Sequence, residues 1–156
     1  MNSNIIYKIF NSKINFLNDV EYSENYIKLK EKWSELPMYK DKEKLNKFLN
    51  GYHNNQITLL ISSTGTGKTV ITPKIILAYL HHYKINKKIA ITNPKIITTV
   101  DNAKYGANTM DIKLGNEIGY KYKDSNRDMI SENTQLIYLT DGTLLSILLW
   151  KDILDF

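Results

Sequence analysis

The stretch Ile61–Val70, ISSTGTGKTV, decides how this sequence is interpreted. It ends in the Gly-Lys-Thr of a phosphate-binding loop, but Ser62 stands where such a loop normally begins with Gly or Ala. The apolar run before it, Gln56–Ser62, predicts a strand that is buried on both faces. The residues after it, 68–83, predict a helix with Pro73 in its first two turns, where a missing N–H costs least. This order of strand, glycine-rich turn and helix predicts a working phosphate site.

The residue types in this loop suit a nucleoside triphosphate. Gly65 and Gly67 permit backbone angles and a close approach that a Cβ would deny. We expect the Lys68 ammonium to reach between the β- and γ-phosphates, and the Thr69 hydroxyl to coordinate Mg²⁺. Backbone N–H groups would surround the β-phosphate at the start of the helix. The residues predicted to bind ATP, or another triphosphate, are Thr64, Gly65, Thr66, Gly67, Lys68, Thr69 and Val70.

Composition sets wide limits on the function. The chain has 156 residues, with 42% hydrophobic and 24% charged residues, and this is typical of one globular domain. A net charge of +5 favours an anionic partner such as nucleotide or nucleic acid. The absence of cysteine excludes disulfides and thiolate metal sites. The longest apolar run, Leu144–Trp150, is too short to span a bilayer. We therefore expect a soluble, intracellular protein, cytoplasmic or nuclear, that makes no contact with a membrane.

Lysine and arginine are used very unequally. Lysine occurs 20 times and arginine once, at Arg127, in a chain that is also rich in Asn and Ile. This bias is typical of A/T-rich coding, as in an A/T-rich microbe or a large DNA virus. Because bidentate guanidinium contacts are almost unavailable, phosphate must be met by lysine or by backbone N–H groups.

The rest of the chain alternates between predicted helices and strands. Residues 24–36 place Tyr26 and Trp33 on one face of an amphipathic helix, which Pro37 ends. Residues 40–52 predict a second helix, with Gly51 as its C-terminal stop. Beyond the loop, we predict strands at 87–94 and 133–142, a strand or hairpin arm at 115–124, and helices at 95–110 and 143–154. This alternation predicts an α/β fold with a parallel sheet that helices cover on both sides.

Four segments together resemble the first RecA-like domain of DEAH-type superfamily-2 helicases. They are ELPMYKDKEKLNKFL, SSTGTGKT, IAITNPKIITTVDNAKYGA and LGNEIGYKYKDSNRDMISENTQLIYLTDGTLL, in the order and spacing of the family's lead-in and motifs I, Ia and Ib. The resemblance implies a P-loop NTPase fold, a RecA-like parallel sheet flanked by helices. It covers residues 36–156 as a partial ATP-binding domain, preceded by a helical or irregular extension at 1–35.

The resemblance also implies a nucleic-acid interface. Residues Thr92, Asn93, Pro94 and Lys95 match motif Ia, and Thr140, Asp141 and Gly142 match motif Ib. In the family, both motifs touch the sugar–phosphate backbone of a single strand, and we favour RNA over DNA. Considered alone, Thr140–Gly142 is typical of a helix-capping turn, and the two interpretations are compatible.

Three departures from the family pattern limit these expectations. The motif Ia arginine pair is Lys95 and Ile96 here. A position that carries a base-stacking arginine in the family falls on Tyr105, whose ring would either stack on the nucleotide base or fill the helix interface. Nothing matches motif II, the Asp-Glu-Ala-His that holds Mg²⁺, and we expect the missing strand to leave an apolar sheet edge exposed.

Three functions remain open from the sequence. The resemblance implies an ATP-dependent helicase in which Lys68 and Thr69 act in catalysis, and whose remainder lies in cis or in trans. Hydrolysis by these residues alone is then expected to be feeble. The alternatives are a nucleotide- or nucleic-acid-binding module without turnover, and another P-loop enzyme such as a small kinase. The single arginine, Arg127, disfavours the kinase.

Overall fold

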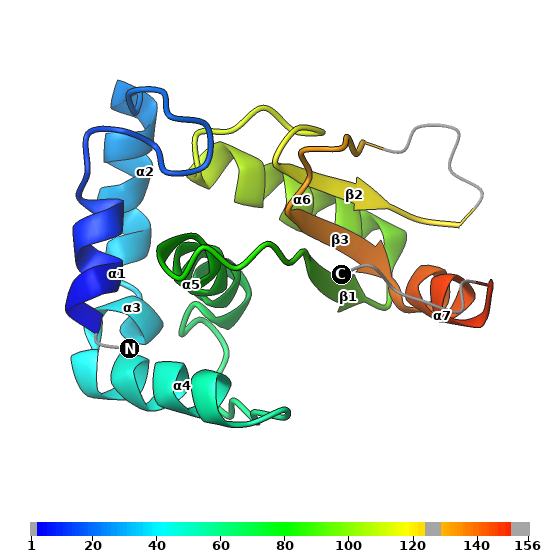
Figure 1. Ribbon diagram of the computed structural model, residues 1–156, viewed down its shortest axis with the longest axis horizontal. Coiled ribbons are helices and arrows are strands. Elements are labelled where there is room, and N and C mark those ends of the chain that lie inside the picture. Colours follow the sequence, from blue (N-terminus) through cyan, green and yellow to red (C-terminus); the bar gives the residue numbers. More distant parts are fainter. Residues whose placement is uncertain (1–2, 124–128, 151–156) are drawn as a thin grey trace. The chain divides into compact units, whose positions relative to one another are not determined.

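The computed structural model describes residues 3–123 and 129–150, which form a mixed α/β structure (Figure 1). The chain divides into two compact units, Met1–Tyr79 and Leu80–Phe156. The phosphate-loop sequence lies in the first unit, and the segments that match motifs Ia and Ib lie in the second.

The first unit is built from helices. In chain order these are α1 (Ser3–Phe10), α2 (Glu24–Ser34), α3 (Pro37–Lys40), α4 (Lys42–Asn54) and α5 (Lys68–His82), of which residues 80–82 belong to the second unit. The Ser23 hydroxyl caps α2 by accepting from the Tyr26 N–H at 3.2 Å, and the Asp41 carboxylate caps α4. Helices α2, α4 and α5 were predicted from the sequence; α1 was not.

Aromatic rings form the core of this unit. Trp33, the centre of the cluster, is 1% exposed and lies edge-on to Phe10 and Tyr39, with ring centroids 5.4 and 5.1 Å away. The Tyr26 ring meets the same tryptophan at 6.5 Å, and its hydroxyl donates to the Phe10 carbonyl. Edge-to-face contacts of this kind add to the free energy gained by burial alone. The burial of Tyr26 and Trp33 confirms the predicted amphipathic helix.

The second unit contains a parallel sheet flanked by helices. Its elements are β1 (Ile89–Asn93), α6 (Ile96–Thr109), β2 (Ile118–Lys121), β3 (Leu136–Thr140) and α7 (Asp141–Trp150). The strand order is β1-β3-β2, and both pairings are parallel. Helix α6 packs against all three strands, while α7 contacts β3 and β1. The predicted α/β class is therefore confirmed, and the sheet is that of a partial RecA-like domain.

The strand predicted for Gln56–Ser62 is wrong. These residues pair with no strand in the described part of the chain, and Ile57, Leu59 and Ile61 are 87, 81 and 83% exposed. The cause is the lack of a partner, because an apolar run becomes a buried strand only when neighbouring strands satisfy its backbone. The apolar side chains are thus exposed, but on an unpaired segment and not at the sheet edge that the sequence predicted.

The predicted end of the helix at Gly51 is also wrong. Helix α4 continues to Asn54, and its C-cap is Asn55, whose N–H donates to the Gly51 carbonyl at 3.1 Å. Gly51 does not adopt a positive φ, so it is an interior helix residue. A glycine inside a helix costs about 1 kcal/mol of stability relative to alanine. Helix α4 nevertheless continues past Gly51, so other interactions of the helix offset this cost.

Candidate functional site

The segment that follows Ser62 turns sharply into the N-terminus of α5. Gly65 and Gly67 have φ values of +81° and +94°, which favour glycine. Helix α5 begins at Lys68, and the Ile71 N–H donates to the Gly67 carbonyl at 2.7 Å. The first N–H groups of such a helix have no partner within the helix, so they remain available to an anion. The expected turn is therefore present, and Thr64, Gly65 and Thr69 are exposed on it.

The two sides of the loop differ in their surroundings. A Cβ added at Gly65 would meet nothing within 4 Å, whereas one added at Gly67 would lie 3.0 Å from Leu36 Cβ, Leu36 Cδ1 and Ile71 Cγ1. The Met38 N–H also donates to the Thr66 carbonyl at 3.0 Å. One side of the loop is thus held by Leu36, by Met38 of α3 and by α5, and the other side is open.

The Lys68 ammonium lies across the start of the loop. Its Nζ donates to the Ser62 carbonyl at 2.5 Å, to the Ser62 hydroxyl at 2.9 Å and to the Ser63 carbonyl at 2.8 Å. The Thr66 hydroxyl lies 2.7 Å from the Ser62 hydroxyl and donates to the Ser63 carbonyl at 3.0 Å. The departure from Gly or Ala at position 62 therefore has a structural consequence, because its hydroxyl contacts both Lys68 and Thr66.

A hollow of about 600 Å³ lies beside the loop. Its walls are mostly apolar and come from α3, α4 and the unpaired segment before the loop: Pro37, Met38, Lys44, Lys47, Phe48, Thr58, Leu59, Leu60, Ile61, Ser62, Ser63 and Thr66. Two lysines are its only charged residues among those described. The exposed apolar segment and the polar loop thus line the same hollow.

Sequence reasoning missed a buried lysine in α5. Lys74 is 2% exposed, and its Nζ lies 5.6 Å from the centre of the Trp33 ring. Burial lowers the pKa of Lys74 from 10.5 to about 7, because removal from water disfavours the charged form. The tryptophan face attracts the ammonium and partly offsets this cost. Lys74 therefore links the helix of the loop to the aromatic cluster of the first unit.

The residues that match motifs Ia and Ib come together at one edge of the sheet. Asn93 and Thr140 are register partners at the carboxyl ends of β1 and β3, and α6 and α7 begin directly beyond them. The Asn93 Oδ1 accepts from Asn102 at 3.2 Å, while its buried Nδ2 has no hydrogen-bond partner among the described groups. The Thr140 hydroxyl lies 2.7 Å from that of Thr143.

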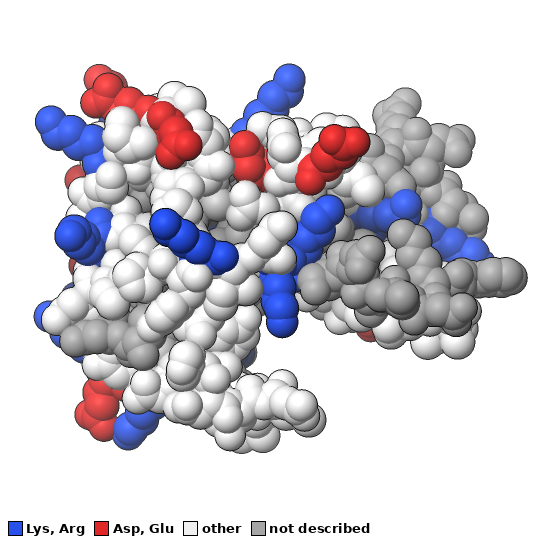
Figure 2. Space-filling view, in the orientation of Figure 1, with Lys and Arg blue, Asp and Glu red and all other residues white. Residues whose placement is uncertain are grey.

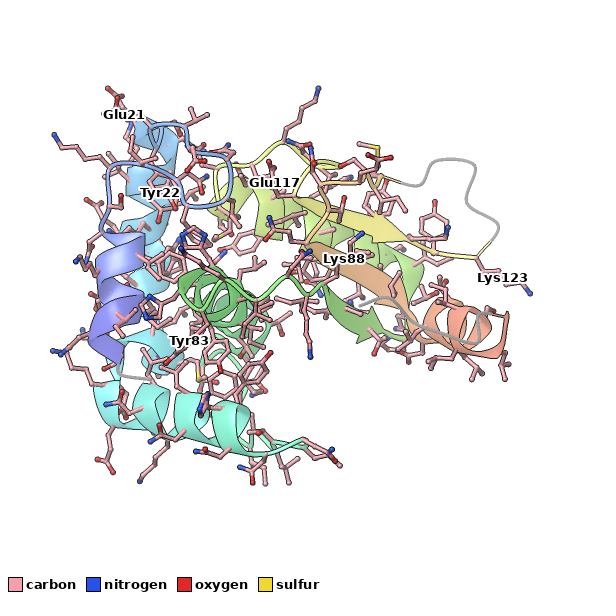
Figure 3. The ribbon with its side chains drawn as sticks, viewed as in Figure 1. Glu21, Tyr22, Tyr83, Lys88, Glu117 and Lys123 are labelled. Atoms are coloured by element: carbon pink, nitrogen blue, oxygen red, sulfur yellow. The ribbon has the colours of Figure 1, made fainter. Side chains whose placement is uncertain are left out.

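Most of the other residues of these two segments face solvent. Thr92, Pro94 and Lys95 are exposed, as are Asp141 and Gly142. Asp141 is the first residue of α7, so Thr140–Gly142 does form a helix start. Lysines also flank the sheet, with Lys88 directly before β1 and Lys123 beyond β2 (Figure 3). On the face shown in Figure 2, basic side chains are spread out among acidic ones rather than gathered in one patch.

Tyr105 lies on α6 in the second unit and is 47% exposed. Half-exposure of this ring is compatible with stacking on a base and with a place in a helix interface. His81 and His82 are exposed at the end of α5. Within residues 3–123 and 129–150, no three His, Cys, Asp or Glu side chains gather as metal ligands. No helix of that same part is long and apolar enough to cross a membrane.

Comparisons with known proteins agree with this fold. Residues 24–147 match the family model described as type III restriction enzyme, res subunit. A mimivirus protein from Acanthamoeba polyphaga mimivirus, named "Putative ATP-dependent RNA helicase", is 39% identical over 128 residues, or 82% of this chain and 18% of the relative.

Two cellular proteins are also similar over 110 residues, or 70% of this chain. One from Saccharomyces cerevisiae, named "Probable ATP-dependent RNA helicase", is 34% identical and covered over 14% of its length. One from Borreliella burgdorferi, named an ATP-dependent RNA helicase, is 37% identical and covered over 12%. The chain thus spans less than a fifth of the length of each of these three relatives. It belongs to the family described as type III restriction enzyme, res subunit, and is a helicase-family domain with a partial RecA-like fold.

Proposed function

We propose that this chain is the ATP-binding part of a DEAH-type, nucleic-acid-dependent nucleoside triphosphatase that acts as a helicase. The observation that carries the proposal is the turn of Gly65 and Gly67, both at positive φ, into the N-terminus of α5. Lys68 and Thr69 begin that helix, as binding of a magnesium-complexed triphosphate requires. The order of the four sequence segments supports the assignment to the DEAH type.

The geometry of the loop fits a phosphate group. Open space in front of Gly65 leaves room for an anion, and the contacts behind Gly67 hold the loop in its curled form. The backbone N–H groups from Thr64 to Val70 would surround the phosphate oxygens, and the Thr69 hydroxyl would coordinate Mg²⁺. ATP, when bound, would supply the phosphoanhydride whose hydrolysis drives the enzyme. On the sequence resemblance alone, we propose Tyr105 as the candidate residue for stacking on the base.

We propose that the second unit contacts single-stranded RNA. The interface would consist of Thr92, Asn93, Pro94, Lys95, Thr140, Asp141 and Gly142. The register pairing of Asn93 with Thr140 supports this, since it brings two helix N-termini to one edge of the sheet. The names of the relatives favour RNA over DNA.

Turnover and unwinding are proposed for a larger protein or assembly. Catalysis of phosphoryl transfer needs metal ligands, a positioned water and cationic groups together. These would come from further segments in cis or in trans, since the relatives are more than five times as long as the matched region. The division into an extension at 1–35 and an ATP-binding domain at 36–156 stays a prediction.

Binding of a fluorescent ATP analogue, titrated with Mg²⁺ and with EDTA, tests this proposal. We expect saturable binding that needs Mg²⁺ and that is lost in Lys68→Ala, because the ammonium is the main cation of the loop. Lys28→Ala removes an exposed lysine of α2 and serves as the matched control. Equal binding by both variants would contradict the assignment. Binding without phosphate release, even with single-stranded RNA added, would favour the alternative of a module without turnover.

A further inference from the structure

The hydroxyl of Ser62 makes the phosphate loop of this chain different from one that begins with Gly or Ala. An ammonium group has three donors and no acceptor. The three acceptors around Lys68 Nζ are the Ser62 carbonyl, the Ser62 hydroxyl and the Ser63 carbonyl, at 2.5, 2.9 and 2.8 Å. All three donors of Lys68 are therefore occupied by the loop itself.

The direction of each hydrogen bond follows from counting protons. The Thr66 hydroxyl has one proton, and it donates that proton to the Ser63 carbonyl at 3.0 Å. In the 2.7 Å contact between Ser62 and Thr66, Thr66 must therefore accept and Ser62 must donate. The lone pairs of Ser62 Oγ then face Lys68. One consistent series runs from Lys68 to Ser62, from Ser62 to Thr66 and from Thr66 to the Ser63 carbonyl.

A phosphate oxygen can contact Lys68 only by replacing one of these acceptors. The two carbonyls belong to the backbone, and any residue type at positions 62 and 63 would supply them. The Ser62 hydroxyl is the one acceptor that depends on the side chain, and Gly or Ala would lack it. It is also the longest of the three contacts, at 2.9 Å. The hydroxyl is thus the group that an arriving phosphate displaces.

We propose that Ser62 sets the nucleotide affinity of this chain, because its hydroxyl competes with phosphate oxygens for the Lys68 ammonium. This inference rests on the proposed nucleotide site. Ser62 is a positioning residue here: it acts on the phosphate through Lys68. A hydrogen bond to a charged group must be given up on binding, and only part of its free energy is recovered from the new phosphate contact.

The test compares dissociation constants for a fluorescent ATP analogue with Mg²⁺ across a small set of variants. Ser62→Ala and Ser62→Gly remove the hydroxyl and should tighten binding by roughly two- to tenfold. Ser62→Thr keeps a hydroxyl and should bind like the unmodified chain. Ser63→Ala is the matched control, because Ser63 contacts Lys68 through its carbonyl alone. Ser62 is exposed, so its removal leaves the core intact, and thermal unfolding checks this.

The outcomes separate this inference from the proposed function. Tighter binding in Ser62→Ala and Ser62→Gly, with Ser63→Ala and Ser62→Thr unchanged, supports the competition. Equal or weaker binding in Ser62→Ala overturns the competition. The proposed nucleotide site would still stand in that case if Lys68→Ala abolishes binding. If binding tightens in Ser63→Ala as much as in Ser62→Ala, the competition is also overturned. Absence of binding in every variant, the unmodified chain included, removes both the site and the inference.

Discussion

The Met38 N–H donates a hydrogen bond to the Thr66 carbonyl at 3.0 Å and so ties the residues before α4 to the middle of the phosphate loop. In a trans peptide, the carbonyl and the following N–H point in opposite directions. Holding the Thr66 carbonyl towards Met38 therefore directs the Gly67 N–H away from it. Because Met38 is 5% exposed and neighbours the aromatic cluster, the orientation of this peptide depends on the packing of the first unit.

Gly67→Ala should weaken nucleotide binding. The new Cβ would lie 3.0 Å from Leu36 and Ile71, at a φ of +94° that residues with side chains rarely adopt. Backbone strain of this kind costs about 1–3 kcal/mol, so we expect the affinity for the ATP analogue to fall by about tenfold or more. Gly142→Ala is the control, because its Cβ would meet nothing within 4 Å and its φ is not positive. Wild-type affinity in Gly67→Ala would show that this contact does not shape the loop.

Lys74→Met should stabilise the first unit and change its response to pH. The pKa of Lys74 falls from 10.5 to about 7 on folding, so between these values the unfolded chain holds a proton that the folded chain lacks. The free energy of unfolding therefore rises with pH across this range, and below about pH 7 the cost of the buried ammonium is present in full.

Methionine fills a similar volume without a charge, so we expect a gain on the order of a few kcal/mol at pH 7. Urea unfolding at pH 7 and pH 9.5 measures it: the difference in stability between the two pH values should shrink in the variant. Lys28→Met, on the exposed surface, should retain that difference. A loss of stability in Lys74→Met would mean that the contact with Trp33 outweighs the cost of desolvation.

Local signals in the sequence predicted most of the elements. The glycine-rich turn located α5, and Pro94 located the end of β1. A two-residue alternation located β2, and a short strand pattern that runs into a turn located β3, each to within a few residues. Helix α1 was not predicted, because two buried residues, Ile6 and Phe10, within eight residues are too few to show helical periodicity.

The failure at Gln56–Ser62 and the missed contacts of the loop concern segments far apart in the chain. An apolar run such as Gln56–Ser62 looks the same whether or not partner strands exist, so its exposure was unpredictable from local sequence. The loop residues were predicted from the motif, yet the tether from Met38 to Thr66 was not, because nothing local joins residues 28 positions apart. The competition at Ser62 could be inferred only from the positions of the three acceptors around the Lys68 ammonium. The residue types are known from the sequence, but the number of acceptors that surround Lys68 is known only from the structure.

Lys95→Ala should weaken the binding of single-stranded RNA and reduce its dependence on salt. Lys95 is exposed beside Asn93, at the edge where β1 and β3 end. Loss of one phosphate contact should lower the slope of log affinity against log salt by about 0.7 for a single strand. Lys113→Ala, an exposed lysine beyond α6, is the control. Fluorescence anisotropy at several salt concentrations measures both, and identical slopes would exclude Lys95 from the interface.

Leu59→Lys should reduce self-association of the chain without loss of stability. Leu59 is 81% exposed in a segment without strand partners, and unpaired apolar segments of this kind pair readily with another chain. A lysine at this position removes apolar surface, and its charge repels the same charge on a second copy. Its side chain lies in solvent, so the stability of the chain should change little. Light scattering should show fewer oligomers, with an unchanged melting temperature. Leu45→Lys is the contrast, since Leu45 is fully buried and a charge at that position should unfold the first unit. A large fall in melting temperature for Leu59→Lys would mean that the segment is packed in solution.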